Sequence, residues 1–442
     1  MRKKLIIAAA IIVLLLFTFI AVFQYRQYSS YQVPVHAAAQ TIVKINADDF
    51  IQLFVKNYGI NFKKKIAKPV DKEKEPSLNT GIWVPGNLFI YNLSPLRPGT
   101  FFCTLPLVNQ QDFLLYAQKK WKLQWLQKDG IYYGSDEAGT LTVACNKAYI
   151  SIAWSPGKEQ VQLYLKEILV SKSMASQHGA VTARFKKEGL PVIAINDQGM
   201  ATLSFKGNQL ILHATADSVQ GINIPSSLQQ SRHVAGTHSF FSLNARFSPS
   251  LFKKEYSIKQ YGLATDSLLQ YLKHYAYFSM GAGSVQKDSS TTYEYDDNFE
   301  KVETVSVTDV QVPALQFSIS AAPGLLQYLQ QQKFVSADRE LNREVFPLYR
   351  VTVQEGGAML RFGTGEQQPL QAVASDHFLD LQIDIEKLVT QLKLPLLDAY
   401  VKNLSGIKMQ GSKQQGKLVV DGAVLFKGKA FKQVVELVKT LK

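Results

Sequence analysis

The string with the most direct chemical meaning is GSKQQGK, Gly411–Lys417, which matches the G-x-x-x-x-G-K pattern of a phosphate-binding loop. Such a loop needs a Ser or Thr after the lysine to bind the metal ion, and a helix whose N-terminus faces the phosphates. Leu418 stands at the hydroxyl position, and the residues after it, LVVDGAVLF, have the composition of a strand. We therefore interpret the string as an exposed hairpin turn.

Two serines begin S-x-x-K strings, Ser155–Lys158 and Ser250–Lys253. Acyl-enzyme hydrolases use this spacing to place a lysine beside a nucleophilic serine, together with further partner motifs. We find no such partner motifs here. Ser155 precedes Pro156 and an amphipathic pattern, so we interpret it as a helix N-cap followed by proline at the first helical position. Both serines stay open as nucleophiles of a hydrolase whose site is assembled from distant segments.

Metal ligands are also scarce in the sequence. None of the seven histidines lies in an H-E-x-x-H string or pairs with a cysteine at zinc spacing. The acids of Glu294–Glu300 offer oxygen ligands for calcium, but they lack the spacing and central glycine of a calcium-binding loop. We interpret this stretch as a hairpin with its turn at Asp296–Asn298. No catalytic, cofactor-binding or metal-binding residue is predicted, and no cofactor.

The tryptophans and cysteines allow two interpretations each. All four tryptophans fall in the first half of the chain, where they form either a core or a ligand-binding surface, and the spacing favours core packing. Cys103 and Cys145 each lie on the apolar side of a strand-like alternation. They are either a disulfide of an exported protein or buried thiols.

The N-terminus predicts a membrane anchor. Residues 5–23 carry no charge and, as a helix, span about 28 Å, close to the thickness of a bilayer core. Arg2, Lys3 and Lys4 precede them, so the positive-inside bias places the N-terminus in the cytoplasm and the bulk of the chain outside. The alternative is a signal peptide cleaved near Ala37–Ala39. We expect residues 1–30 to form a cytoplasmic stub and an uncleaved transmembrane anchor.

The formal net charge of +14 comes largely from two basic stretches. Residues 402–442 hold nine lysines and two acids, and residues 62–76 hold six lysines and three acids. These are either solvated lysine faces or surfaces for anionic lipid or an envelope polymer, with the C-terminus as the main candidate. No nucleic-acid-binding motif is present, so nucleic acid is not an expected partner.

Three segments predict a strand followed by a helix start, namely 41–57, 238–252 and 377–392. In the first, Asn46 can cap a helix that begins with acidic residues. A longer strand-helix pattern occurs at 101–121, with Asn109 as a helix cap, and is repeated at 315–332. An amphipathic helix is predicted over Lys429–Leu441. The fold class is α+β with largely antiparallel sheets and packed helices, in two related halves, 35–230 and 231–442, after one transmembrane helix.

This combination resembles uncharacterised single-pass bacterial envelope proteins with a repeated β-rich exported region. The resemblance rests on MRKK with the apolar run, the strand-Asn-helix segments and the closing KLVVDGAVLFKGKAFKQVVELVKTL. It implies a bacterial inner-membrane protein that faces the periplasm, and it implies no catalytic residues. We expect a non-catalytic binding or scaffolding module whose protein partner is unknown. A lipid or glycolipid carrier and a hydrolase with a nonlocal site are the alternatives.

Overall fold

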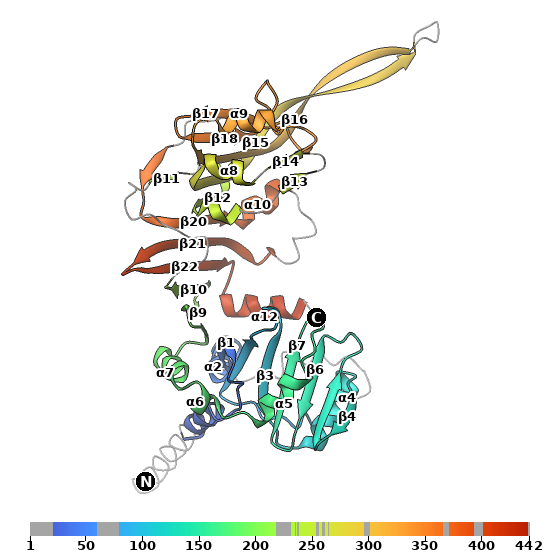
Figure 1. The fold of residues 1–442 in the computed structure, drawn as a ribbon, viewed down its shortest axis with the longest axis vertical. Helices are drawn as coiled ribbons and strands as arrows, with labels where there is room; N and C mark the ends of the chain where they lie inside the picture. Colours follow the sequence, from blue (N-terminus) through green and yellow to red (C-terminus); the bar gives the residue numbers. More distant parts are fainter. Residues whose placement is uncertain are drawn as a thin grey trace, which may run out of the picture. The chain divides into compact units, whose positions relative to one another are not determined.

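The computed structural model describes residues 21–59, 79–217, 231–234, 236, 238–252, 256–258, 261–263, 265–295, 301–365, 371–392 and 401–440. The chain divides into two compact units, unit 1 (Met1–Ser204) and unit 2 (Phe205–Lys442) (Figure 1). This division precedes the boundary predicted near residue 230, and residues 218–230 lie outside the described part of the chain.

The structure corrects the predicted fold class. It is mostly antiparallel sheet, with 46% of the described residues in strands and 26% in helices. In the ranges given above, no helix is both long enough and apolar enough to cross a lipid bilayer. Of the predicted span, residues 5–20 lie outside those ranges, and residues 21–30 form a helix with polar contacts from Arg26 and Gln27. The predicted transmembrane helix, single-pass topology and extracytoplasmic location are therefore contradicted.

Unit 1 is a single antiparallel sheet. The strands follow the order β9-β8-β1-β2-β3-β7-β6-β5-β4, so the first strand of the unit lies inside the sheet and β4 lies at one end. Their bounds are β1 (Ala39–Asn46), β2 (Asn87–Leu93), β3 (Phe101–Pro106), β4 (Gln124–Lys128), β5 (Ile131–Ser135), β6 (Leu141–Cys145), β7 (Tyr149–Trp154), β8 (Val192–Ile195) and β9 (Gly199–Lys206).

Helices cover parts of both faces of this sheet. On one face, helix α5 (Gln162–Val170) packs with α6 (Met174–Gln177) and α7 (Gly179–Glu188) around a core that includes Phe102, Leu165 and Phe185. On the other face, α4 (Gln110–Lys120) buries Phe113 against Val143 and Ile150. Unit 1 also contains the helix over residues 21–30 and helix α2 (Ala47–Tyr58).

In unit 2 the strands are also antiparallel and follow the order β10-β22-β21-β20-β12-β15-β16-β18-β17. Two short ribbons, β11–β19 and β13–β14, accompany them. The bounds are β10 (Gln209–Ala216), β11 (Ser231–His233), β12 (Ser239–Arg246), β13 (Tyr256–Ile258), β14 (Tyr261–Leu263), β15 (Leu272–Tyr295), β16 (Lys301–Ala321), β17 (Thr352–Gly356), β18 (Met359–Gly363), β19 (Ala372–Ala374), β20 (His377–Asp384), β21 (Leu404–Gln414) and β22 (Lys417–Phe426).

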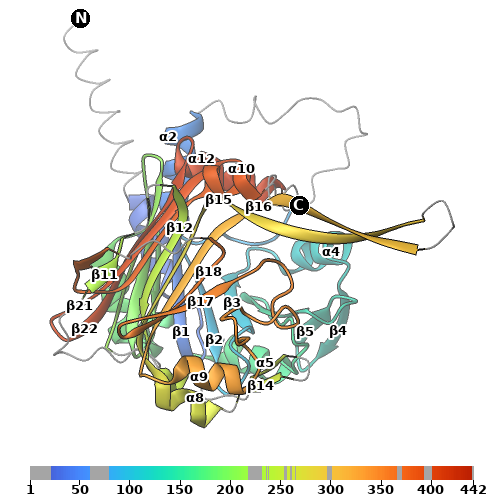
Figure 2. The same cartoon turned by 90° about the horizontal axis from the view of Figure 1, so that it is seen from above.

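The core of unit 2 lies between helix α9 (Leu325–Gln331) and the strands β16–β18. Leu325, Leu326 and Leu329 of α9 are buried against residues such as Val353 and Leu360. Figure 2 shows α8 beside α9 along the same part of the sheet. The other helical elements that the structure describes in unit 2 are η1 (Pro249–Phe252), α8 (Thr265–Tyr271), α10 (Ile385–Leu392) and α12 (Ala430–Thr440).

Six strands follow the same order in the two units. Unit 1 has β8-β1-β2-β3-β7-β6, and unit 2 has β20-β12-β15-β16-β18-β17. In both units a helix, α4 or α9, follows the third strand of the chain segment. The two units thus share one antiparallel topology, although their added strands and helices differ.

Local sequence explains where several elements begin. The Asn46 side chain accepts a hydrogen bond from the Asp49 backbone N–H (3.2 Å), which caps α2 as predicted. Asn109 caps α4 in the same way through the N–H groups of Gln111 and Asp112. The predicted strand and helix over 377–392 are β20 and α10, and the predicted C-terminal helix is α12. In 238–252, by contrast, β12 is followed only by the short η1.

Candidate functional site

A groove of about 610 Å³ lies in unit 1 between the β4–β5 hairpin and helix α5. The hairpin supplies the floor and α5 supplies one wall. Figure 1 shows α5 in front of the sheet near β6 and β7, with β4 farther out at the end of the sheet. The lining residues are Gln124, Leu126, Lys128, Asp129, Tyr133, Gly134, Ser135, Asp136, Glu137, Gln162, Leu163 and Lys166.

The floor of the groove is fixed by a two-residue turn at Asp129 and Gly130. Both residues have positive φ angles, 53° and 75°, as the twist of a tight hairpin requires. This turn sets a register in which Leu126 lies opposite Tyr133, and both side chains line the groove. Trp125 projects to the other face, where its indole Nε1–H donates to the Leu114 carbonyl of α4 (3.1 Å). The hairpin therefore holds a core residue on one face and groove residues on the other.

The outer edge of β4 is open. Among the described residues, β4 pairs only with β5. Lys128 and Ile131 flank the two-residue turn, so they form a hydrogen-bonded pair and the pairing alternates from there. The backbone N–H and C=O groups of Gln127 and Trp125 consequently point away from β5. An open edge of this kind is a template for another strand.

Helix α5 contributes one apolar residue to the wall of the groove, Leu163, beside Gln162 and Lys166. Leu165 and Ile168 face the core and are fully buried. Leu163 faces the other way and is 64% exposed, close to the 68% exposure of Leu126 on the floor. Two leucines exposed to this degree on the same groove leave apolar surface that a ligand can cover.

Charged groups lie at both ends of the groove. At the turn end, the Lys166 ammonium pairs with the Asp129 carboxylate (Nζ–Oδ2, 3.0 Å). The hydrogen bond from Lys166 lowers the pKa of Asp129, and the same contact raises the pKa of Lys166. At the other end lie Asp136 and Glu137. Burial raises the pKa of Asp136, but hydrogen bonds from Leu141 and Thr140 outweigh that effect and lower it.

These groups suit binding better than chemistry. The described residues that line the groove include no histidine and no cysteine. The one serine, Ser135, donates its hydroxyl proton to Thr142 Oγ1 (3.3 Å). Burial raises the pKa of Tyr133, which keeps the phenol protonated. The groove thus offers apolar contacts, charges and a strand edge, without a nucleophile and base in contact.

Ser155 has a structural role that differs from the predicted one. It is buried, its Oγ accepts a hydrogen bond from the Glu159 N–H (3.1 Å), and it lies 3.0 Å from Thr100 Oγ1. The predicted N-cap is wrong, because α5 begins at Gln162 after Val161, with no side-chain cap. Lys158 explains the difference, since its φ of 54° is left-handed and interrupts any helix from Pro156.

The other predicted chemical motifs also have structural explanations. Ser250 Oγ lies 2.7 Å from Ser248 Oγ, while Lys253 is outside the described residues. The string Gly411–Lys417 is a hairpin between β21 and β22, as predicted. Gln415 and Gly416 at its turn have φ angles of 50° and 82°. The turn predicted at Asp296–Asn298 lies outside the described residues, between the paired strands β15 and β16.

The histidines do not converge on one site. His36 pairs with Glu167 (2.9 Å) in unit 1, and His213 pairs with Asp421 (2.7 Å) in unit 2. Within the described ranges, no group of three or more His, Cys, Asp or Glu residues is arranged to hold a metal ion. The remaining histidine of chemical interest, His233, belongs to a polar layer in unit 2.

That polar layer runs across the sheet in register. Asp380, Asn244, Tyr277, Ser318 and Arg361 lie opposite one another on β20, β12, β15, β16 and β18. The first four are between 0% and 7% exposed, so the sheet buries a row of polar groups. The ribbon strand β11 packs on this row.

Residues of β11 form hydrogen bonds and an ion pair with part of this row of buried polar side chains. Arg232 forms an ion pair with Asp380, and the His233 N–H donates to Asn244 Oδ1 (2.9 Å). The His233 ring meets the rings of Tyr275 and Tyr277 edge-on, with centroids 5.5 Å apart in each case. Burial and the nearby Arg361 charge lower the pKa of His233.

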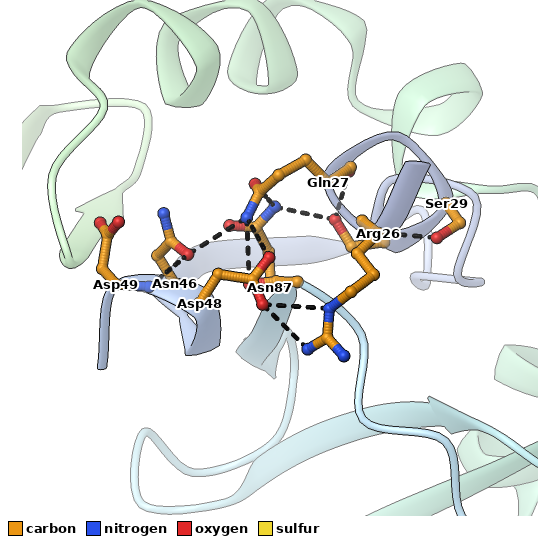
Figure 3. A network of polar contacts seen from close by, with 9 residues as sticks. Arg26, Gln27, Ser29, Asn46, Asp48, Asp49 and Asn87 are labelled. Atoms are coloured by element: carbon orange, nitrogen blue, oxygen red, sulfur yellow. Dashed lines mark hydrogen bonds and ion pairs between the residues drawn. The ribbon is translucent and has the colours of Figure 1, made fainter. Parts of the chain in front are cut away.

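A second polar network fixes the start of α2 in unit 1 (Figure 3). The buried Asp48 carboxylate accepts hydrogen bonds from Arg26 Nε (3.0 Å) and Gln27 Nε2 (3.0 Å). Gln27 also donates to Asn46 Oδ1 (3.2 Å) and accepts from Asn87 Nδ2 (2.7 Å). Each of these side chains bonds to another side chain of the network, although the buried Asn87 Oδ1 has no hydrogen-bond partner. We assign the network a structural role, because it joins the 21–30 helix to α2 and β2.

The tryptophans have two different environments. Trp121 and Trp125 pack edge-on against Phe113 with centroid distances of 5.9 Å, which confirms core packing for this pair. Trp154 is 51% exposed and stacks on Phe101 across β3 and β7, which the core interpretation did not predict. The cysteines do not form a disulfide. Both thiols are free, and burial raises the pKa of Cys103 to about 12 and that of Cys145 to about 11.

The C-terminal lysines are distributed over β21, β22 and α12. Several pair with carboxylates of unit 2: Lys417 with Asp217 (3.2 Å), Lys427 with Glu386 (3.3 Å) and Lys439 with Glu436 (2.7 Å). These pairs fit solvated lysine faces. Binding of anionic lipid or an envelope polymer to this region stays a prediction.

The groove residues were not identified from the sequence. Two signals point to them in retrospect. Leu163 is apolar although it lies outside the buried face of α5, and Leu126 is apolar on the face of β4 opposite Trp125. An exposed apolar residue on an element whose core face is already complete suggests a contact surface.

Comparison with known proteins gives no functional information. No protein-family model matches the sequence, and no curated protein matches it. Solved structures of TP0453 are weakly similar. Crystal form III is 9% identical with a TM-score of 0.23 and covers 81% of this chain and 97% of that chain. Crystal form I is 9% identical with a TM-score of 0.22 and covers 82% and 98%. Similarity at this level carries no argument about function.

Proposed function

We propose that unit 1 is a non-catalytic binding domain that holds an extended polypeptide segment in the groove between the β4–β5 hairpin and α5. The observation that carries the proposal is the open edge of β4 on a groove that exposed Leu126 and Leu163 both line. Together they offer a bound strand both backbone partners and apolar contacts, the two components of strand addition to a sheet edge.

The groove's dimensions and charges define the class of ligand. β4 and β5 have five residues each, so the floor is about 15 Å long and accommodates a similar number of extended residues. An alternating pattern, with one or two apolar side chains facing Leu126 and Leu163, fits the middle. Glu137 at one end favours a basic residue there, and the Lys128 end favours an acidic one.

These features support a peptide more than the lipid alternative. An acyl chain is best held in an enclosed apolar site, whereas this groove has one wall and charged ends. They also support binding more than hydrolysis, because Ser155 is buried and hydrogen-bonded to Thr100 and Glu159 away from the groove lining.

A peptide-display selection on the immobilised full-length protein tests the proposal. Leu126→Asp is the loss-of-binding variant, because it places a charge on the groove floor. Val170→Asp is the matched control, because Val170 is on the same helix α5 and 77% exposed but does not line the groove.

We expect selected peptides to bind the wild type and Val170→Asp equally and to lose at least about tenfold in affinity for Leu126→Asp, since burial of one leucine is worth about 1.5–3 kcal/mol. Peptides recovered after overnight incubation should be intact by mass spectrometry. Enrichment that is indifferent to Leu126→Asp would refute the groove, and cleaved peptides would refute the non-catalytic assignment.

A further inference from the structure

Strands β15 and β16 continue as an isolated two-stranded ribbon beyond the sheet of unit 2. We call residues 284–295 and 301–312 the arm. Its register runs from Ser284 opposite Val312 to Tyr295 opposite Lys301. The neighbouring strands β12 and β18 pair only with the inner parts of β15 and β16. Both views show the arm reaching out past the other elements of unit 2 (Figures 1 and 2).

One face of the arm carries exposed apolar side chains among charged ones such as Lys287, Glu303 and Asp309. Val285, Val305 and Val307 are 54%, 60% and 59% exposed, and Tyr293 is 55% exposed. The register places all four on the same face, because residues opposite one another share a face and alternate residues return to it. Valine on a ribbon without a core to cover is unusual, since a two-stranded ribbon is marginally stable in water by itself. The exposed valines of the arm are therefore typical of strands that another polypeptide covers in the functional state.

The backbone shows which residues face the open edge of β16. At the inner end, the Ala321 N–H donates to the Ala358 carbonyl and the Leu315 carbonyl accepts from the Thr364 N–H, both on the β18 side. Odd-numbered residues of β16 therefore direct their backbone groups toward that side. β18 ends its pairing at Gln316, so along the arm the same groups of Val305, Val307 and Asp309 face outward, and no strand of the described residues pairs with them.

We propose that this edge pairs with the same edge of a second copy of the chain, antiparallel, with the two-fold axis at Val305. In this register Val305 meets Val305 of the second copy, and Glu303 meets Val307. Lys301 meets Asp309 at each end, so the symmetry forms two opposite-charge pairs at once. Asp309 then lies between Lys287 of its own chain and Lys301 of the second copy.

Charge complementarity selects this register over its neighbours. An axis at Ser306 places Glu303 opposite Asp309, which joins like charges. An axis at Val307 places Lys301 opposite Pro313, so no pair of opposite charges forms. Like charges directly opposite one another destabilise strand pairing. Among these registers, only the one centred on Val305 forms pairs of opposite charges, one Lys301–Asp309 pair on each side of the axis.

Two sets of variants of the full-length protein test the pairing. The first is a charge exchange, measured by sedimentation velocity. Lys301→Asp and Asp309→Lys should each weaken the dimer about tenfold, because symmetry duplicates a pair worth about 0.2–1 kcal/mol and adds like-charge repulsion. The double variant should restore the wild-type dissociation constant. Thr308→Lys on the opposite face is the control and should leave it unchanged.

The second test reads the register directly through oxidative cross-linking of single cysteine variants. Val305→Cys should form a disulfide-linked dimer rapidly, because residues directly opposite in antiparallel strands have Cα atoms within disulfide range. Val307→Cys should cross-link slowly, since its opposite residue is Glu303 of the second copy. The free wild-type cysteines, buried Cys145 and half-buried Cys103, provide the background rate. A monomeric wild type, or equal cross-linking at 305 and 307, would overturn the proposal.

Discussion

The Arg26–Asp48 pair allows a sharp test of how unit 1 is held together, because its two members differ in exposure. The Asp48 side chain is 3% exposed and that of Arg26 is 24% exposed. Arg26→Met leaves a buried carboxylate without its cation, and loss of one partner of a buried pair costs about 3–5 kcal/mol. Asp48→Asn leaves a guanidinium that reaches water and keeps an acceptor for Gln27, so we expect about 1–2 kcal/mol.

The assay is urea unfolding followed by tryptophan fluorescence. All four tryptophans lie in unit 1, so this signal reports that unit and not unit 2. The unfolding midpoints should fall in the order wild type, Asp48→Asn, Arg26→Met. The double variant should be more stable than Arg26→Met alone, since it removes the unpaired carboxylate. Equal midpoints for the two single variants, or an Arg26→Met loss below about 1 kcal/mol, would refute the reasoning that burial sets the cost.

Three further outcomes follow from the structure. Burial and the Arg361 charge lower the pKa of His233, so the folded state resists protonation of this ring. Unit 2 should therefore lose stability as the pH falls below about 6.5. Hydrogen exchange in β11 and β19 should rise below this pH in the wild type but not in His233→Gln. Cys103 and Cys145 should react with a thiol reagent at pH 8 only after denaturation, because burial raises both pKa values to about 11–12; rapid labelling of native protein would contradict their burial. Gly411→Ala should destabilise unit 2 by about 1–3 kcal/mol in thermal unfolding, since its Cβ would lie 2.5 Å from the Phe378 ring, whereas Gly428→Ala, next to the flexible Gln433 side chain, should cost less.

Features that depend on neighbouring residues were predictable from the sequence. Asn46 and Asn109 cap helices because the cap needs only the next three residues. The glycine at 416 indicated a hairpin for the same reason. Ser155 shows the limit of local reasoning. Its pattern is that of an N-cap, but the left-handed Lys158 ends the local helical geometry before α5 begins.

Features that depend on strand pairing over long distances were not predictable. The polar layer of unit 2 joins Asp380 to Asn244 and Ser318, and only the register of the whole sheet brings them together. The groove likewise depends on β4 being the last strand of its sheet, which the order of strands in the chain does not reveal. The apolar run at 5–23 predicted a membrane span, and the described structure instead places the end of that segment in a helix that binds unit 1 through Arg26 and Gln27.

The most direct test of the binding account is hydrogen exchange of the β4 backbone amides, measured with and without a peptide from the display selection. The amides of Trp125 and Gln127 point away from β5 and should exchange rapidly in the free protein, while those of Leu126 and Lys128 are already bonded to β5. Addition of the peptide should protect Trp125 and Gln127 specifically. Protection elsewhere in the chain, with no change at these two amides, would contradict the proposal that a polypeptide strand binds at the β4 edge.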